Sequence, residues 1–175
     1  RLLTVTGVQT CALPISNDVD LAQDFCGLSL PVPIIAAAMD AVVSPATAGI
    51  VRGLGGLAFI NLEGLWFRYA DPAPCFAAIA AAPKGDVQAL FAELYAQPID
   101  ERLIPRRFVE MREAGAPVAV AATPQAVGRY GDAVVAAGAE LLLVQSQVSS
   151  ARHLATGYAP LELADFVQRT DRKST

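Results

Sequence analysis

The amino-acid sequence predicts an α/β fold built on parallel β-strands. Four short apolar runs, at residues 32–37, 57–60, 118–121 and 141–144, are separated by segments whose apolar residues recur at helical spacing. Runs of this length are too short for a buried helix and suit parallel strands covered on both faces. Ser44-Pro45 and Thr123-Pro124 each add a helix start shortly after a strand.

The segment around which we expect the fold to be organised is residues 33–60, a strand, loop, helix and second strand. The Ser44 hydroxyl is suited to accept an unpaired backbone N–H, and Pro45 has the φ of a first helical residue. A helix is therefore predicted from Pro45 to about Arg52. The glycines that follow allow the chain to turn into the second strand: Gly53, Gly55 and Gly56.

Two parallel strands joined in this way form a right-handed βαβ unit, and such sheets bind ligands beyond the carboxyl ends of their strands. The loops at residues 39–44 and 61–65 are therefore the candidate walls of a binding site.

An extra helical insertion is predicted after the second strand. Helices are expected from Asp71-Pro72 to about Ala82, from an N-cap at Asp86 to Pro98, and from Asp100 to Gly115. The chain then returns to βα units, with a helix that ends at Gly138 and a closing amphipathic helix whose apolar residues are Leu161, Leu163, Phe166 and Val167.

Four βα units make about half of a (β/α)₈ TIM barrel, which needs about 250 residues to close. An open doubly wound sheet has the same pattern of strands and helices, so periodicity alone leaves both architectures open.

Composition excludes several classes of function. The chain has 175 residues, 54% of them hydrophobic and 17% charged, with a net charge of −4 and no basic stripe, so no nucleic-acid partner is expected. No apolar run reaches the ~18 residues of a membrane span. Three irregularly spaced cysteines and the single histidine, His153, predict neither a disulfide framework nor a metal site, and a reducing, cytoplasmic location is expected.

The two ends of the chain do not resemble the rest. Residues 5–15, VTGVQTCALPI, resemble the translated read-through of a sequencing-library adapter, and residues 171–175, DRKST, resemble the complementary adapter in another frame. We therefore expect residues 1–16 and 171–175 to be adapter-derived scars that flank a partial barrel domain at residues 17–170.

Three motifs in the predicted barrel resemble the IMP dehydrogenase and GMP reductase family. Residues 36–42, AAAMDAV, resemble the Ser-Ala-Ala-Met-Asp-Thr-Val signature of these enzymes. Residues 54–60, LGGLAFI, resemble the glycine-rich strand that follows it, and residues 137–144, AGAELLLV, resemble the family's Ala-Gly-Val-Asp strand. The short interval at residues 61–116 leaves no room for the family's regulatory CBS modules, so the chain is most similar to the IMP-dehydrogenase-related subfamily that lacks them, and to its N-terminal half only.

The resemblance implies a tetrameric (β/α)₈ barrel in which a loop cysteine attacks C2 of IMP, hydride passes to NAD, and water releases XMP. By position, Met39 would contact the purine of IMP, and Gln145 and Ser146 would face the nicotinamide of NAD. The catalytic cysteine, the phosphate-binding loops, any monovalent-cation site and the mobile flap belong to the other half. No catalytic residue is therefore assigned here, and the chain alone is expected to be inactive.

Three alternatives to an IMP dehydrogenase remain open. A GMP reductase shares the barrel and purine site, and a flavin-dependent nitronate-monooxygenase-like barrel has similar strand ends but prefers glycine where Asp40 stands. A non-catalytic nucleotide-binding paralogue would explain why Ala36 and Ala37 replace the family's serine and why Gln145 replaces its aspartate.

Several prominent residues also have purely structural interpretations. Asp40 is expected to hold its turn, and Glu63 to be a solvated loop carboxylate. Trp66 and Phe67 are expected to cover apolar surface, and His153 to lie on the surface.

Overall fold

The computed structural model describes residues 20–145 and 160–170. The predicted terminal scars, Ser146 and His153 lie outside these ranges. The described strands form parallel pairs, β3 with β4, β5 with β6 and β6 with β7. Their bounds are β3 (Ile35–Ala36), β4 (Leu57–Ala58), β5 (Ile60–Asn61), β6 (Ala119–Ala122) and β7 (Leu141–Val144). The predicted parallel α/β fold is confirmed.

The strands stand in the order β3, β4/β5, β6, β7, because β4 and β5 are consecutive pieces of one apolar stretch divided at Phe59. β3 is shorter than the predicted residues 32–37, since Pro33 has no N–H to donate to a strand ladder. Ile34 and Ile35 are exposed, so the prediction that this strand is covered on both faces is wrong. Its described strand partner is β4 alone.

Side chains alternate across the strands and divide the core into two layers. Leu57, Phe59 and Ala121 pack on one face with Leu30. The other face packs against the helices and carries Ala58, Ile60, Leu62, Val118 and Val120. A period of two along each strand therefore places one set of apolar residues under the helices and one set on the opposite face.

Helix α2 (Pro45–Gly53) begins as the sequence predicts. The Ser44 hydroxyl accepts from the Thr47 N–H at 3.0 Å, and the Thr47 hydroxyl oxygen accepts from the Ser44 N–H at 2.7 Å. These reciprocal bonds form a capping box and satisfy two donors at the helix start. Thr123 caps α6 (Pro124–Ala136) through a longer bond, 3.3 Å from the Ala126 N–H.

Replacing Ser44 with alanine is expected to lower the free energy of unfolding by about 1 kcal/mol, because the Thr47 N–H loses its partner. Thr123→Ala is expected to cost about half as much, since its cap bond is longer and has no reciprocal partner. Urea unfolding of the two variants measures both values, and a larger loss for Thr123→Ala would contradict the capping-box argument.

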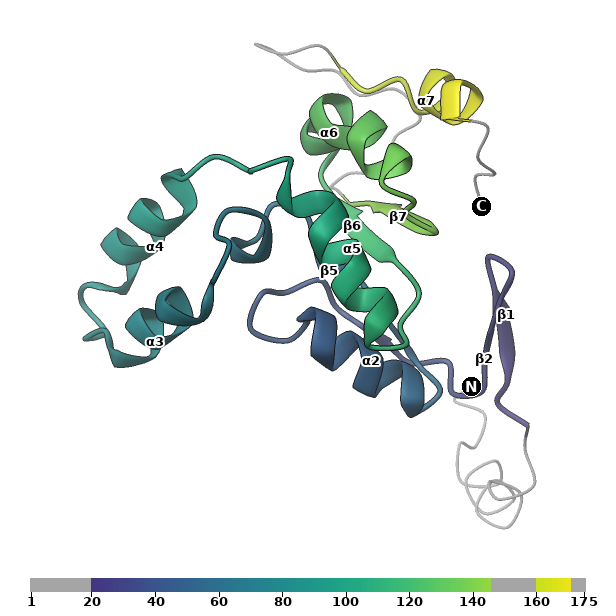
Figure 1. Ribbon diagram of the computed structural model, residues 1–175, viewed down its shortest axis with the longest axis horizontal. Coiled ribbons are helices and arrows are strands. Elements are labelled where there is room, and N and C mark those ends of the chain that lie inside the picture. Colours follow the sequence, from purple (N-terminus) through teal and green to yellow (C-terminus); the bar gives the residue numbers. More distant parts are fainter. Residues whose placement is uncertain (1–19, 146–159, 171–175) are drawn as a thin grey trace, which may run out of the picture.

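The predicted helical insertion is present between β5 and β6. It contains η1 (Leu65–Phe67), α3 (Ala73–Ala81), α4 (Val87–Ala96) and α5 (Leu103–Glu113). Figure 1 shows α3 and α4 as a pair at the left, apart from the strands, whereas α5 lies across α2. We call α3 and α4, residues 73–96, the helical arm. Asp86 stands at the N-cap position of α4, as predicted, but its side chain makes no cap hydrogen bond.

A β-hairpin of β1 (Gln23–Phe25) and β2 (Leu28–Leu30) precedes the parallel strands. The sequence pattern predicts only a polar-to-apolar lead-in there, with Leu21, Phe25 and Leu28 packed under one end of the barrel. Phe25 and Leu28 do pack with the core layer that contains Leu30 and Leu57, but Leu21 is 54% exposed, contrary to this prediction. The connecting residues Cys26 and Gly27 both have positive φ, at 54° and 83°, as a two-residue hairpin turn requires.

Helix α7 (Leu163–Thr170) closes the described chain and packs on α6. Phe166 is buried, and its ring lies where a Cβ on Gly131 would stand, 2.6 Å from the nearest ring atom. The absence of a side chain at Gly131 therefore lets the two helices approach each other.

Candidate functional site

The carboxyl ends of the strands meet along one edge of the parallel array. The main chain fixes this alignment, since Leu62 donates to the Ala121 carbonyl and Gln145 donates to the Ala122 carbonyl, both at 2.9 Å. Met39 and Asp40 follow β3, Glu63 follows β5, Thr123 follows β6, and Gln145 follows β7. The sequence-predicted loops therefore lie together where α/β sheets bind their ligands.

Met39 is presented on this edge by a tight turn. Its carbonyl oxygen accepts from the Val42 N–H at 2.9 Å and from the Val43 N–H at 2.8 Å. The side chain itself is 53% exposed. An exposed thioether on a main chain that is fixed in this way is suited to pack against a flat apolar ring.

Asp40 ties the Met39 turn to two other parts of the chain. Its Oδ2 accepts from the Leu65 N–H at 2.7 Å and from the Tyr95 hydroxyl at 2.6 Å, and its carbonyl accepts from the Trp66 indole N–H at 3.4 Å. The prediction that Asp40 holds its loop is confirmed. Its Oδ1 is so close to the main chain of Gly64 that a Cβ there would stand 1.8 Å away.

Glu63 is not the solvated carboxylate that the sequence predicts. It is half-buried, and its Oε2 accepts from the Thr123 N–H at 2.9 Å. Its carbonyl accepts from Arg68 Nε at 2.9 Å. Glu63 therefore joins the loop after β5 to the start of α6, which explains why it is not free to face solvent.

The end of the helical arm reaches the same edge through Tyr95. The Arg68 guanidinium lies over the Tyr95 ring, 5.6 Å from its centre, and donates to the carbonyls of Tyr95 and Gln97. Burial, and then the hydrogen bond to Asp40, raise the pKa of the Tyr95 phenol. The sequence gives no sign of this contact, because Tyr95 and Asp40 are 55 residues apart.

The raised pKa of Tyr95 predicts a loss of stability in alkaline solution. An unfolded tyrosine ionises near pH 10, whereas the folded state holds Tyr95 neutral to higher pH. Its contribution is therefore complete below about pH 10 and is lost as pH rises through the folded-state pKa. Phenolate absorbance of the protein minus that of Tyr95→Phe isolates this titration. A difference curve centred at or below the pKa of an ordinary tyrosine would contradict it.

Gln145 is exposed at the carboxyl end of β7. Three strand spacings separate β3 from β7, which corresponds to about 14 Å along the edge. Met39 and Gln145 therefore follow the first and the last strand of this edge. Ser146, the second predicted cofactor residue, lies outside the described residues.

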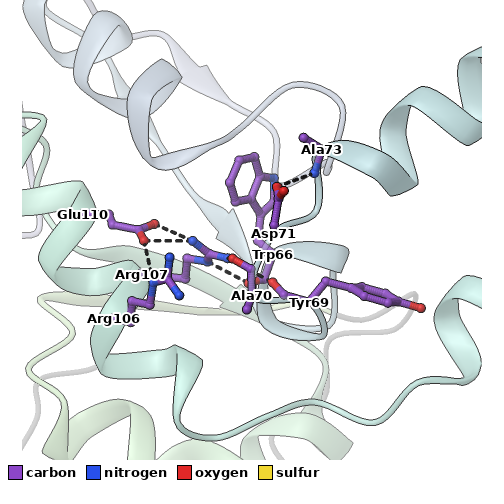
Figure 2. A network of polar contacts seen from close by, with 8 residues as sticks. All are labelled: Trp66, Tyr69, Ala70, Asp71, Ala73, Arg106, Arg107 and Glu110. Carbon is purple, nitrogen blue, oxygen red and sulfur yellow. Dashed lines mark hydrogen bonds and ion pairs between the residues drawn. The ribbon is translucent and has the colours of Figure 1, made fainter.

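Arg107, which is only 3% exposed, fixes the loop after β5 (Figure 2). Its guanidinium donates to the carbonyls of Trp66, Tyr69 and Ala70 at 2.8–3.0 Å, and to the Glu110 carboxylate at 2.7 and 2.9 Å. The guanidinium also lies 5.3 Å from the centre of the Trp66 ring. Phe67 is fully buried and Trp66 packs on the core, so the prediction that both cover apolar surface is confirmed.

The described residues offer neither a cluster of metal ligands nor a membrane-spanning helix. Residues 20–145 and 160–170 contain no group of three or more histidine, cysteine, aspartate or glutamate side chains placed to hold a metal ion. Within the same ranges no helix combines the length and apolar character needed to cross a membrane.

No protein-family model matches the chain. Its curated relatives include uncharacterized oxidoreductases of Mycolicibacterium smegmatis, 35% identical over 161 residues, and of Mycobacterium leprae, 34% identical over 161 residues. Each match covers 89% of this chain but 43% of the relative, so the chain spans less than half the length of these proteins.

A similar solved structure is that of an IMP dehydrogenase/GMP reductase-like protein from Corynebacterium glutamicum. It has 32% sequence identity and a TM-score of 0.80, and the match covers 90% of this chain and 42% of that chain. The chain therefore shares its α/β fold with an IMP dehydrogenase/GMP reductase-like protein over most of its length, in agreement with the resemblance of its motifs.

Proposed function

We propose that this chain is the N-terminal half of a (β/α)₈ barrel whose full-length protein oxidises IMP to XMP, with NAD as hydride acceptor. The observation that carries the proposal is the edge at which Met39 and Gln145 follow β3 and β7, in a chain 32% identical to an IMP dehydrogenase/GMP reductase-like protein. In balanced form, IMP, NAD⁺ and water give XMP, NADH and a proton.

The residues at this edge fit the two ligands chemically. The exposed thioether of Met39 suits the apolar face of a purine. The exposed amide of Gln145 suits the nicotinamide carboxamide, because each group both donates and accepts hydrogen bonds. NAD, when bound, accepts the hydride that leaves C2 of the hypoxanthine ring. We propose that this chain binds and orients the two ligands, with Gln145 and Ser146 at the nicotinamide.

The chemistry itself is assigned to the remainder of the full-length protein. The catalytic cysteine, the phosphate-binding loops, any monovalent-cation site and the flap with its general base are proposed to lie there. The chain alone is therefore proposed to be inactive, and the full-length protein to be a cytoplasmic tetramer.

A nucleotide-binding paralogue without turnover is the second candidate. Ala36 and Ala37 offer only methyl groups at the end of β3, and Gln145 is uncharged where the family has a carboxylate. These substitutions remove a hydroxyl and a negative charge from the proposed ligand edge while leaving its apolar surface in place.

The proposal is tested with the full-length protein expressed from its intact gene, which also shows whether residues after Thr170 continue into a strand, a glycine-rich loop and a cysteine loop. We expect NADH to form from IMP and NAD. Consumption of NADPH with GMP would assign the reductase instead, and calorimetric IMP binding without turnover would assign the paralogue. A protein that binds neither purine nucleotide, or that holds a flavin, would overturn the proposal.

A further inference from the structure

We propose that Tyr95, at the end of the helical arm, is a positioning residue for the nucleotide site: its hydroxyl fixes the Met39 turn through Asp40. The inference rests on the proposed function, because it assigns to the arm the task of shaping the proposed purine contact. Tyr95 itself does not touch substrate or cofactor.

The Asp40 carboxylate depends on few partners. Both of its described hydrogen bonds are made by Oδ2, one from the Leu65 N–H at 2.7 Å and one from the Tyr95 hydroxyl at 2.6 Å. Oδ1 is buried, faces Gly64 and has no hydrogen-bond partner among the described residues. Loss of the Tyr95 hydroxyl would therefore leave a largely enclosed carboxylate with a single donor, and such a group moves toward water.

Tyr95 is well placed to hold Asp40 because its own position is fixed. Arg68 covers its ring and donates to its carbonyl at 3.0 Å. The Tyr69 hydroxyl donates to the neighbouring Leu94 carbonyl at 3.1 Å. The end of α4 is thus attached at several points to the segment that follows η1.

The same contacts reach a second strand end. Arg68 also donates to the Glu63 carbonyl at 2.9 Å, and the Glu63 carboxylate accepts from the Thr123 N–H at 2.9 Å. The arm is therefore connected through Asp40 to the loop after β3, and through Arg68 and Glu63 to the loops after β5 and β6. A displacement of the arm would move the purine side of the edge, whereas Gln145 is attached to β6 by its own main chain.

This asymmetry defines the expected kinetic effect of Tyr95→Phe in the full-length protein. If the Met39 turn is correctly placed only a tenth of the time, apparent affinity for the purine falls about tenfold. We expect KM for IMP to rise about tenfold, while KM for NAD and kcat change by less than about twofold. The matched control is Tyr130→Phe, which removes a hydroxyl from a tyrosine buried in α6. An equal rise in both KM values, or no rise in KM for IMP, would overturn the inference.

A second measurement does not depend on the proposed function. The Val42 and Val43 amides donate to the Met39 carbonyl, so their hydrogen exchange reports whether the turn is closed. In Tyr95→Phe we expect these amides to exchange about tenfold faster than in the unsubstituted protein or in Tyr130→Phe. Unchanged exchange would overturn the positioning role even in an active enzyme. Faster exchange in a protein that does not bind IMP would instead sustain the coupling and reject the proposed function alone.

Discussion

Replacing Arg107 with methionine is expected to lower the free energy of unfolding by about 3 kcal/mol. Methionine retains much of the aliphatic stem but removes every donor of the guanidinium. Three carbonyls, those of Trp66, Tyr69 and Ala70, then lose the partner that holds the loop after β5. Glu110 also loses its ion pair with the buried guanidinium, although its 29% exposed side chain can still reach water.

Arg106 provides a matched control on the same helix. It contacts the same carboxylate, with 3.0 Å between its Nε and Glu110 Oε1, but its side chain is 55% exposed (Figure 2). Arg106→Met is expected to cost less than about 0.5 kcal/mol, as is usual for exposed ion pairs. Urea unfolding measures both variants. Similar losses at the two positions would show that the ion pair to Glu110, and not the set of backbone carbonyls, accounts for the role of Arg107.

Replacing Gly49 with alanine is expected to destabilise the protein by about 3 kcal/mol, through overpacking where α2 crosses α5. A Cβ at Gly49 would stand 2.2 Å from the Ala114 carbonyl oxygen. Because the clash is with main chain, a change of rotamer cannot relieve it, and one of the two helices has to shift. The expected result is a lower melting temperature with a less tightly packed α2.

Gly53, the last residue of the same helix, separates this clash from the intrinsic effect of the substitution. A Cβ at Gly53 meets nothing within 4 Å. Gly53→Ala is therefore expected to be neutral or to stabilise by up to about 1 kcal/mol, as alanine does in open helical positions. Thermal unfolding of both variants gives the comparison, and a tolerated Gly49→Ala would mean that the α2–α5 contact is looser than the structure indicates.

Local signals in the sequence were sufficient to predict most of the elements. Ser44-Pro45 and Thr123-Pro124 mark helix starts that the structure confirms with cap hydrogen bonds. The hairpin was missed because its turn is Cys26-Gly27, and cysteine at a positive-φ turn position is not a recognised signal. Helix starts and turns can thus be predicted from the sequence where the residues that form them are close neighbours along the chain.

The candidate site was only partly predictable, because most of its contacts join residues that are far apart along the chain. Its edge follows from strand order, but the contacts that fix it join distant segments, as Tyr95 to Asp40 and Glu63 to Thr123 do. Arg107 could have been singled out from the sequence, because it lies on the same face of α5 as four apolar residues. These are Leu103, Ile104, Phe108 and Met111. A charged residue in an apolar stripe indicates a buried polar partner, although the sequence does not say which.

The reactivity of the Cys75 thiol can report on the packing of the helical arm. The thiol is buried in α3, and this burial raises its pKa, so little of the reactive thiolate is present near neutral pH. Alkylation of Cys75 is therefore expected to be slower than that of the exposed Cys26, and its rate would report how often the thiol becomes accessible. A ligand that seats the Met39 turn would slow the reaction, and the extent of that slowing would report how strongly arm and ligand edge are coupled.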